Sequence, residues 1–562
     1  MSADLDRVEA GQQCQEFRIV GPPGTGKTTY LSRQIKRAAE RFGPNDVLVT
    51  SFSRAAAAEL VARDLPLPRD RIGTLHSHCY HALGTPTIAE SKAEEWNERH
   101  NNWQLTATKS SKIDEGESAG SSSDESSTAK SGDSMLETVN RWRGMMFPEV
   151  AWPMGHRQFY RQWQLWKNEN GYVDFTDLIE KCLEDVSFAP GMPKTIIADE
   201  VQDNSKLHLS LIRKWGKHCE YFCLAFDDDQ LIYSFTGATV EAILDPPVPQ
   251  ENVIILKQSY RVPVAVHGLA NRWIRTVRRR QEKEYLPRDA PGLVCEHPAS
   301  HDSPSRIVDD IGEHVVAGKT VMVLASCGYM LQPLIRALRE AGLPFHNPYR
   351  RSNGGWNPLR STQRGAAANR VLALVSAHPQ FDEHPQPWSR GSLALWAEWL
   401  DSKRALTRGS KAAIARWAEA TWDQPITIET LSELFEEQPL RDMLTAYNGS
   451  IADLVGWWQS HMSESHRPRV EFARSILLRR GPGGLINEPK VVVGTIHSVK
   501  GGQADVVYLL PDLSIEGGRT MAKADGEDNI TRLFYVGMTR AREELHVCQP
   551  VPGSRAFVSI KI

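Results

Sequence analysis

The stretch Gly21-Pro-Pro-Gly-Thr-Gly-Lys-Thr28 follows the apolar run Phe17 to Val20 and precedes a helix-compatible segment. A glycine-rich turn between a strand and a helix lets backbone N–H groups close around phosphate oxygens, and a lysine there can neutralise the outer phosphates. The threonine hydroxyl can ligate Mg²⁺. The sequence therefore predicts an ATP or GTP site formed by Gly21, Pro22, Pro23, Gly24, Thr25, Gly26, Lys27, Thr28 and Thr29.

Short apolar runs recur along the chain, each followed by polar or glycine-rich residues and then a helix-compatible stretch. This alternation is typical of an α/β domain with a parallel sheet. The first series comprises Phe17 to Val20, Val47 to Thr50, Ile196 to Ala198 and Phe222 to Phe226. The second comprises Val253 to Leu256, Val321 to Leu324, Val491 to Val493, Val506 to Leu510 and Leu545 to Val547. We therefore expect two α/β lobes.

Each lobe is expected to carry a mainly helical insertion. The first insertion is rich in tryptophan and contains Lys109 to Ser134, a serine-rich acidic stretch that we predict to be a flexible loop because it has too few apolar residues to offset its ordering entropy. The second is bounded by glycine and proline clusters, which suit hinges. The expected division is 1–83 and 171–250 for the first lobe, 84–170 for its insertion, 251–352 and 485–562 for the second lobe, and 353–484 for its insertion.

Composition places the chain among multidomain globular proteins. A chain of 562 residues is too long to fold around a single hydrophobic core, so we expect about three or four domains. The formal charge of -3 means that any nucleic-acid groove needs a local excess of Lys and Arg. The N-terminus lacks the features of a signal peptide and no apolar run reaches membrane-spanning length, so we expect a cytoplasmic protein. Cys219 and Cys223 would make an incomplete zinc site, and free thiols are expected.

A second chemical motif is the run Ile196-Ile-Ala-Asp199-Glu200-Val-Gln-Asp203. It places two carboxylates at the end of a buried strand. Asp199 can hold the metal ion, and Glu200 can accept a proton from the water that attacks the γ-phosphate. An acidic pair at a solvated strand end is the alternative, but the phosphate loop upstream favours the catalytic interpretation.

This acidic run resembles the second motif of superfamily 1 helicases of the UvrD/Rep/PcrA type, and further matches follow in that family's order. They are Thr50-Ser-Phe-Ser-Arg-Ala-Ala-Ala57, Gly73-Thr-Leu-His-Ser77, Asp227-Asp-Asp-Gln-Leu-Ile-Tyr-Ser-Phe-Thr-Gly-Ala238, Leu256-Lys-Gln-Ser-Tyr-Arg261, Thr495-Ile-His-Ser-Val-Lys-Gly501 and Leu533-Phe-Tyr-Val-Gly-Met-Thr-Arg-Ala-Arg542. The resemblance implies two RecA-like P-loop NTPase lobes with ATP and Mg²⁺ bound between them.

The resemblance also implies roles for single residues. Gln230 would sense the γ-phosphate, and an amide suits this because it donates and accepts hydrogen bonds at once. Arg261 and Arg540 would reach the γ-phosphate from the second lobe and offset its transition-state charge. Tyr260 would stack on adenine, its alternative being a core tyrosine. Gln503 would lie near the nucleotide.

For DNA, the resemblance points to Phe52, His76, Tyr233 and Phe235 on the first lobe and His497 on the second. Aromatic faces stack on any base, so sequence-specific readout is not expected. Two basic clusters could contact phosphates or could simply be solvated. The first is a helix-like stretch with Arg272, Arg275, Arg278, Arg279 and Arg280, and the second is Tyr349-Arg-Arg351.

The chain departs from the family pattern at several positions. The usual adenine-reading glutamine lies well upstream of the phosphate loop, and here only Gln12, Gln13 and Gln15 precede it. Phe235 and Thr236 stand where the family usually has a tryptophan and an arginine, which predicts weaker DNA binding at this motif. Gly502-Gln503 replaces Leu-Glu, so an acidic contact near the ribose becomes an amide.

These observations predict an ATP-dependent DNA helicase that translocates on single-stranded DNA, 3′ to 5′ as the resemblance implies, and opens duplex at single/double-strand junctions. DNA repair or replication is the expected setting, and a loading partner is left open. The alternative is a DNA-stimulated ATPase that displaces bound proteins without unwinding. A helicase-nuclease is not expected, since few residues follow Arg542.

Overall fold

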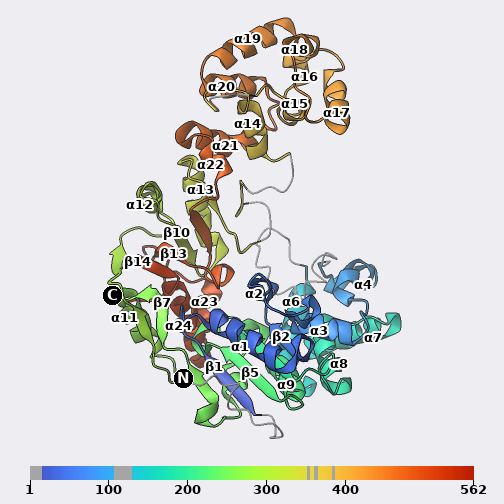
Figure 1. Ribbon diagram of the computed structural model, residues 1–562, viewed down its shortest axis with the longest axis vertical. Helices are drawn as coiled ribbons and strands as arrows, with labels where there is room; N and C mark the ends of the chain where they lie inside the picture. The colour runs from blue at the N-terminus through green and yellow to red at the C-terminus, as the bar shows by residue number, and fades with distance from the viewer. Residues whose placement is uncertain (1–14, 107–129, 351–354, 360–364, 382–385) are drawn as a thin grey trace. The chain divides into compact units, whose positions relative to one another are not determined.

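The computed structural model describes residues 15–106, 130–350, 355–359, 365–381 and 386–562. The chain forms two compact units (Figure 1). The first comprises Met1–Val294, Leu513–Glu544 and Ile560–Ile562, and the second comprises Cys295–Asp512 and Leu545–Ser559. Residues 251–294 therefore group with the segment that carries the phosphate loop.

The sheet of the first unit is built from the apolar runs that the sequence indicates. Its order is β3-β2-β4-β5-β1-β6, and the neighbouring strands are parallel. The strands are β1 (Glu16–Val20), β2 (Val47–Ser51), β3 (Ile72–Thr74), β4 (Thr195–Asp199), β5 (Tyr221–Phe226) and β6 (Val253–Ile255). The strands β2, β4 and β5 are buried along their whole length, as expected where helices cover both faces of a parallel sheet.

One strand expectation is wrong. The run Val253 to Leu256 was assigned to the second series, but β6 pairs with β1 in the first sheet, with Ile254 opposite Ile19. Apolar composition predicts a strand but does not select its neighbour, which depends on the path of the chain after α10. The first unit also contains a small parallel pair, β7 (Gln258–Pro263) and β8 (Leu286–Arg288).

Helices of the first unit flank its sheet and form the first insertion. They are α1 (Lys27–Phe42), α2 (Arg54–Val61), α3 (Leu75–Ala82), α4 (Ala93–Arg99), α6 (Asp133–Gly144), α7 (Met154–Asn170), α8 (Phe175–Asp185), α9 (Lys206–Gly216), α10 (Val240–Leu244), α11 (Val264–Ile274), α23 (Ile515–Met521) and α24 (Ala524–Met538). In the insertion, the buried rings of Trp96, Trp163 and Trp166 pack together. Of the predicted loop 109–134, residues 109–129 lie outside the described part, and Asp133 and Ser134 already belong to α6.

The sheet of the second unit has the order β11-β12-β10-β13-β14-β9. Its strands are β9 (Leu293–His297), β10 (Val321–Ala325), β11 (Phe345–His346), β12 (Val491–Thr495), β13 (Ala504–Leu509) and β14 (Ala541–Cys548). The pairs β11–β12, β12–β10 and β10–β13 are parallel. Two of the points at which the chain passes between the two units lie within β9 and within β14. With its parallel sheets and covering helices, the structure confirms the expected α/β class.

The second insertion is helical, as expected (Figure 1), and its buried residues form a separate hydrophobic cluster. Two helices, α12 (Ser305–Val316) and α13 (Gln332–Glu340), precede it. Its own helices are α14 (Ala367–Val375), α15 (Arg390–Ala397), α16 (Ser402–Ala405), α17 (Ser410–Ala420), α18 (Ile428–Leu434), α19 (Glu437–Asn448), α20 (Ile451–His461), α21 (Arg467–Arg480) and α22 (Gly483–Ile486). Buried Trp396 and Trp458 lie at its centre, and Trp458 Nε1 donates to the Trp396 carbonyl at 2.9 Å. Within the described residues, no helix is both long and apolar enough to cross a membrane.

Candidate active site

The phosphate loop connects β1 to α1. Gly24 and Gly26 take φ angles of 74° and 75°, which residues with a side chain rarely adopt. A Cβ added at Gly24 would lie 2.5 Å from Arg261 Cβ, so Arg261 packs closely against the loop and leaves no room for a side chain at this position. Lys27 opens α1 directly after Gly26, which directs the N–H groups of the first helical turn toward the loop. These features suit a bound phosphate chain.

The acidic pair lies against the phosphate-loop lysine. Asp199 ends β4, and Glu200 follows with a φ of 54°. Lys27 Nζ forms a short ion pair with Glu200 Oε1 and lies 3.4 Å from Asp199 Oδ1. Burial alone would lower the pKa of Lys27, but these carboxylates more than offset it and raise that pKa. The structure thus brings Lys27, Asp199 and Glu200 together.

Gln202 connects the acidic pair to the next motif. Its side chain is fully buried, and its Nε2 donates to Glu200 Oε2 at 2.5 Å. Its Oε1 accepts the backbone N–H of Asp227 at 3.2 Å. Gln202 lies within the acidic run Asp199 to Asp203, and the sequence alone assigns it no role. Its position between two carboxylates in the same run was the signal that could have identified it.

Gln230 uses both ends of its amide. Its Nε2 donates to Asp227 Oδ2 at 2.7 Å, and its Oε1 accepts from Arg540 Nη2 at 3.0 Å. Arg540 is almost completely buried, and its Nε donates to the Val536 carbonyl at 2.9 Å. The two predicted residues Gln230 and Arg540 are therefore in direct contact, within the same compact unit as the phosphate loop.

A buried cation holds the acidic turn that precedes Gln230. Lys283 Nζ lies 2.6, 2.6 and 3.0 Å from carboxylate oxygens of Asp227, Asp228 and Asp229. Arg280 donates to both oxygens of Asp229, at 2.9 and 2.5 Å. Burial alone would lower the pKa of Lys283, but the three carboxylates raise it. Sequence reasoning missed Lys283, because it lies far along the chain in a segment with no recognisable pattern.

Strand β7 lies beside the phosphate loop. Ser259 Oγ donates to the Pro23 carbonyl at 3.0 Å, and the Tyr260 N–H donates to the Gly24 carbonyl at 2.8 Å. These contacts place Arg261 next to Gly24, as the close Cβ approach also shows. The Tyr260 side chain is 73% exposed. The alternative of a core tyrosine is therefore wrong, and the ring lies at the surface beside the loop.

Three of the residues predicted to contact DNA form a row, which we call the aromatic row. The ring centroids of Phe52 and Tyr233 are 5.5 Å apart, and those of Tyr233 and Phe235 are 5.7 Å apart. All three side chains are half-buried. Tyr233 follows Gln230 by only three positions, so a short piece of backbone joins the row to Gln230.

His76 lies in a different environment from the aromatic row. Its ring contacts Phe175 and His208, with centroids 6.1 and 5.1 Å away. Burial lowers the pKa of His76 to about 4, so the ring is neutral at pH 7. Any contact of His76 with DNA would therefore use stacking or a neutral hydrogen bond rather than a positive charge.

The remaining predicted residues belong to the second unit. His497 lies in a short 3-10 helix, His497–Val499, directly after β12, and Gln503 is exposed just before β13. The unusual Gly502 has a steric reason, because a Cβ added there would lie 2.5 Å from the hydroxyl oxygen of Tyr349. The departure from the family pattern at this position thus accompanies the close approach of a tyrosine.

The arginine-rich stretch is not a helical face. Helix α11 ends at Ile274, so most of these arginines follow it. Three of them pair with carboxylates: Arg278 with Asp525 and Asp528, Arg279 with Asp245, and Arg280 with Asp229. Arg280 pairs with the fully buried Asp229, which favours a structural role for it, whereas Arg278 and Arg279 form exposed pairs that contribute little to stability.

Comparisons with known proteins agree with this site. A family model described as "UvrD/REP helicase N-terminal domain" matches residues 6–247, and one described as "UvrD-like helicase C-terminal domain" matches residues 490–548. Together they match more than half of the chain. A "Putative ATP-dependent DNA helicase YjcD" of Bacillus subtilis is 22% identical over 95% of this chain and 76% of its own length.

Two further relatives match over shorter regions. An "ATP-dependent DNA helicase PcrA" of Staphylococcus epidermidis is 23% identical over 59% of this chain and 48% of its own length. A "Probable DNA helicase II homolog" of Mycoplasma capricolum is 23% identical over 58% of this chain and 49% of its own length. The chain thus spans about half the length of these two relatives.

Proposed function

Because the chain belongs to the UvrD/Rep family of helicases, we propose that it is an ATP-dependent DNA helicase that moves 3′ to 5′ along single-stranded DNA. It would separate duplex DNA ahead of it, at single/double-strand junctions. One observation carries the proposal. A continuous path of hydrogen bonds, one of them from the backbone N–H of Asp227, runs from Lys27 through Glu200, Gln202, Asp227 and Gln230 to Arg540.

The contacts support a division of labour in ATP hydrolysis. Lys27 would turn from the acidic pair to the outer phosphates when ATP binds, while Thr28 and Asp199 hold Mg²⁺. Glu200 would then take a proton from the attacking water. Gln202 would orient the Glu200 carboxylate through the 2.5 Å hydrogen bond between them. Arg261 and Arg540 would face the γ-phosphate, with Tyr260 on adenine and Gln503 near the ribose.

The aromatic row supports single-stranded DNA as the track. Phe52, Tyr233 and Phe235 offer faces that stack on any base, which suits movement without sequence preference. His76 and His497 are proposed to contact DNA as well. Because Gln230 and Tyr233 share one short segment, a shift of the amide on hydrolysis would move the row.

The lobe assignment is part of the proposal. Residues 1–83 and 171–250, together with β6 (Val253–Ile255), would form the first RecA-like lobe around the insertion 84–170, and the rest of 251–352 with 485–562 would form the second lobe around the insertion 353–484. The protein would act in the cytoplasm.

Paired assays test the motor function. ATP hydrolysis is measured with and without single-stranded DNA, and strand separation is measured on duplexes with either a 3′ or a 5′ tail. We expect DNA-stimulated hydrolysis and opening of the 3′-tailed duplex. ATP hydrolysis that is indifferent to DNA would refute the motor. Displacement of streptavidin from a biotinylated strand without duplex opening would favour the alternative, a translocase that clears bound proteins.

Two substitutions locate the chemistry. Lys27→Ala and Glu200→Gln should each abolish hydrolysis and leave DNA binding measurable, because neither residue belongs to the aromatic row. The matched controls are Lys194→Ala and Glu220→Gln, which alter an exposed ion pair with an N–O distance of 3.4 Å. Near-normal turnover in either Lys27→Ala or Glu200→Gln would show that the site is misplaced.

A further inference from the structure

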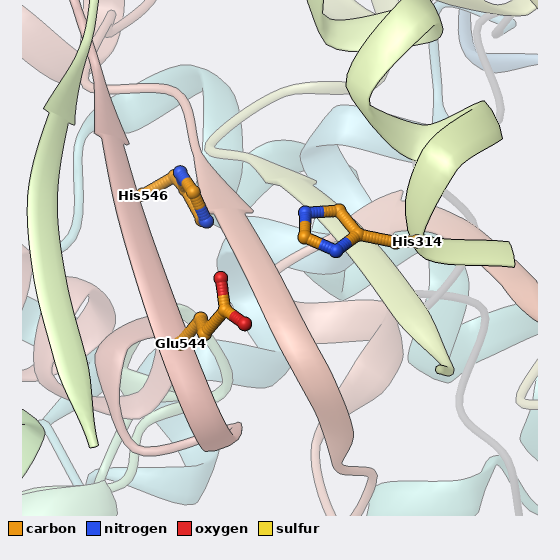
Figure 2. Close-up of side chains that lie close together, drawn as sticks. All are labelled: His314, Glu544 and His546. Carbon is orange, nitrogen blue, oxygen red and sulfur yellow. The ribbon is translucent and has the colours of Figure 1, made fainter. Parts of the chain in front are cut away.

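A cluster of possible metal ligands lies on helix α12 and strand β14. His314, Glu544 and His546 each offer one ligand atom, and these atoms all lie within 4.8 Å of one another. The three side chains are half-buried. Figure 2 shows them pointing toward a common space, His314 from α12 and the other two from β14.

The local structure fixes the elements that carry these side chains. Glu544 and His546 are two positions apart in a strand, so both point to the same side of the sheet, while Leu545 between them is fully buried. His314 lies in the last turn of α12, whose Ile307 and Ile311 are buried in the core beneath the helix. The three ligands are thus carried by packed elements and not by a loop.

The side chain of His546 is oriented by its neighbours. Cys295 Sγ lies 3.2 Å from His546 Nδ1, and the Tyr508 ring stacks on the imidazole with centroids 4.6 Å apart and planes at 19°. Tyr508 is fully buried. Contacts of this kind set the ring orientation of metal-binding histidines and determine which nitrogen is presented to the metal. Here they favour Nε2 as the ligand atom.

The donor set selects a class of metal ion. Two imidazoles and one carboxylate are a known ligand set for Zn²⁺, with a fourth position left for water. Mg²⁺ and Ca²⁺ prefer all-oxygen sites, so the cluster is not suited to the ion that accompanies ATP. Ligand atoms about 2.1 Å from a tetrahedral Zn²⁺ lie about 3.4 Å apart, and the separations here are at most 4.8 Å, so small side-chain rotations would close the site.

We propose that His314, Glu544 and His546 bind one divalent transition-metal ion, foremost Zn²⁺, which links α12 to β14. The site goes beyond the proposed helicase function and does not depend on it. Its effect would be to stabilise the fold, since an ion that binds only the folded chain raises its stability by mass action.

Metal titration of the full chain tests the proposal. The protein, purified without a histidine tag and treated with EDTA, is titrated with Zn²⁺ against a chromophoric chelator, and thermal unfolding is followed with and without Zn²⁺. We expect one tight equivalent and a higher unfolding midpoint for the unsubstituted protein. Glu544→Gln should weaken binding at least about tenfold, because it removes the charged oxygen ligand.

A matched pair of variants separates this site from adventitious binding. His314→Asn and His546→Asn should each lose the tight equivalent and the Zn²⁺-dependent midpoint shift. The control is His461→Asn, because His461 also lies in the last turn of a helix, α20. No tight equivalent in the unsubstituted protein, or equal binding by all three variants, overturns the proposal. Co²⁺ absorption supplies a second readout, and a thiolate signal would also overturn the assigned ligands.

Discussion

Replacing Gln230 by alanine tests the link between ATP and DNA most directly. The substitution removes the 2.7 Å hydrogen bond to Asp227 and the 3.0 Å hydrogen bond from Arg540. A hydrogen bond to a charged group contributes about 1.5–3 kcal/mol. If one of the two bonds strengthens only in the transition state, its loss slows hydrolysis about 10- to 100-fold, at about 1.4 kcal/mol per factor of ten.

The assay is steady-state ATP hydrolysis at saturating ATP, with and without saturating single-stranded DNA. The DNA-stimulated rate should fall by about 10- to 100-fold, while DNA affinity without ATP changes by less than about twofold. Gln230→Glu keeps an acceptor for Arg540 but turns the donor toward Asp227 into an acceptor, so it should be as defective as alanine.

The matched control is Gln438→Ala, which removes an amide-to-carboxylate bond of 2.8 Å on exposed helix α19 and should leave the rate unchanged. A Gln230→Ala enzyme whose DNA-stimulated rate stays within about twofold of normal would refute the reasoning. A Gln230→Glu enzyme that behaves normally would show that the bond to Asp227 is dispensable.

Three further predictions concern stability and nucleotide binding. Lys283→Met should destabilise the fold by about 3–5 kcal/mol, because it leaves buried carboxylates without their cation, and urea unfolding measures this; an unchanged midpoint would contradict it. Tyr260→Ala should raise the KM for ATP about 2- to 10-fold without changing the unfolding midpoint, since the ring is exposed. Burial, assisted by the charge of Asp174, raises the pKa of Glu90 from 4.5 to about 8, so the folded state retains a proton that the unfolded state loses. Stability should therefore fall as pH rises from about 5 to about 8, and Glu90→Gln should flatten this slope in urea unfolding measured across that range; an identical slope would count against it.

Local sequence was sufficient where a function depends on adjacent residues. The phosphate loop at Gly21 to Thr28 and the acidic pair Asp199-Glu200 follow apolar runs that are strands in the structure. The residues of each motif are adjacent in the chain, so the local backbone conformation sets their geometry within a few positions. The choice of Phe52, Tyr233 and Phe235 as DNA contacts came from the resemblance to the helicase family and not from local geometry.

Local sequence failed where a residue's partner lies far along the chain. The sequence around Lys283 contains no pattern that indicates a buried cation. Its three contacts with Asp227, Asp228 and Asp229 identify it. The arginines after α11 look like a basic surface until their carboxylate partners are seen. The role of a charged side chain can be assigned only when its neighbours in space are known. The sequence alone does not distinguish a charged residue in an ion pair from one that is exposed to solvent.

The sequence by itself determined the α/β class, the phosphate loop with its acidic pair, and the order of the helicase-like motifs. These depend on side-chain periodicity and on short-range backbone geometry. The folded chain was needed to show that β6 joins the first sheet, that Gln230 accepts a hydrogen bond from Arg540, and that His314 meets Glu544 and His546. Each of these is a contact between distant segments, and such contacts are fixed by how strands pair and helices pack rather than by any local pattern.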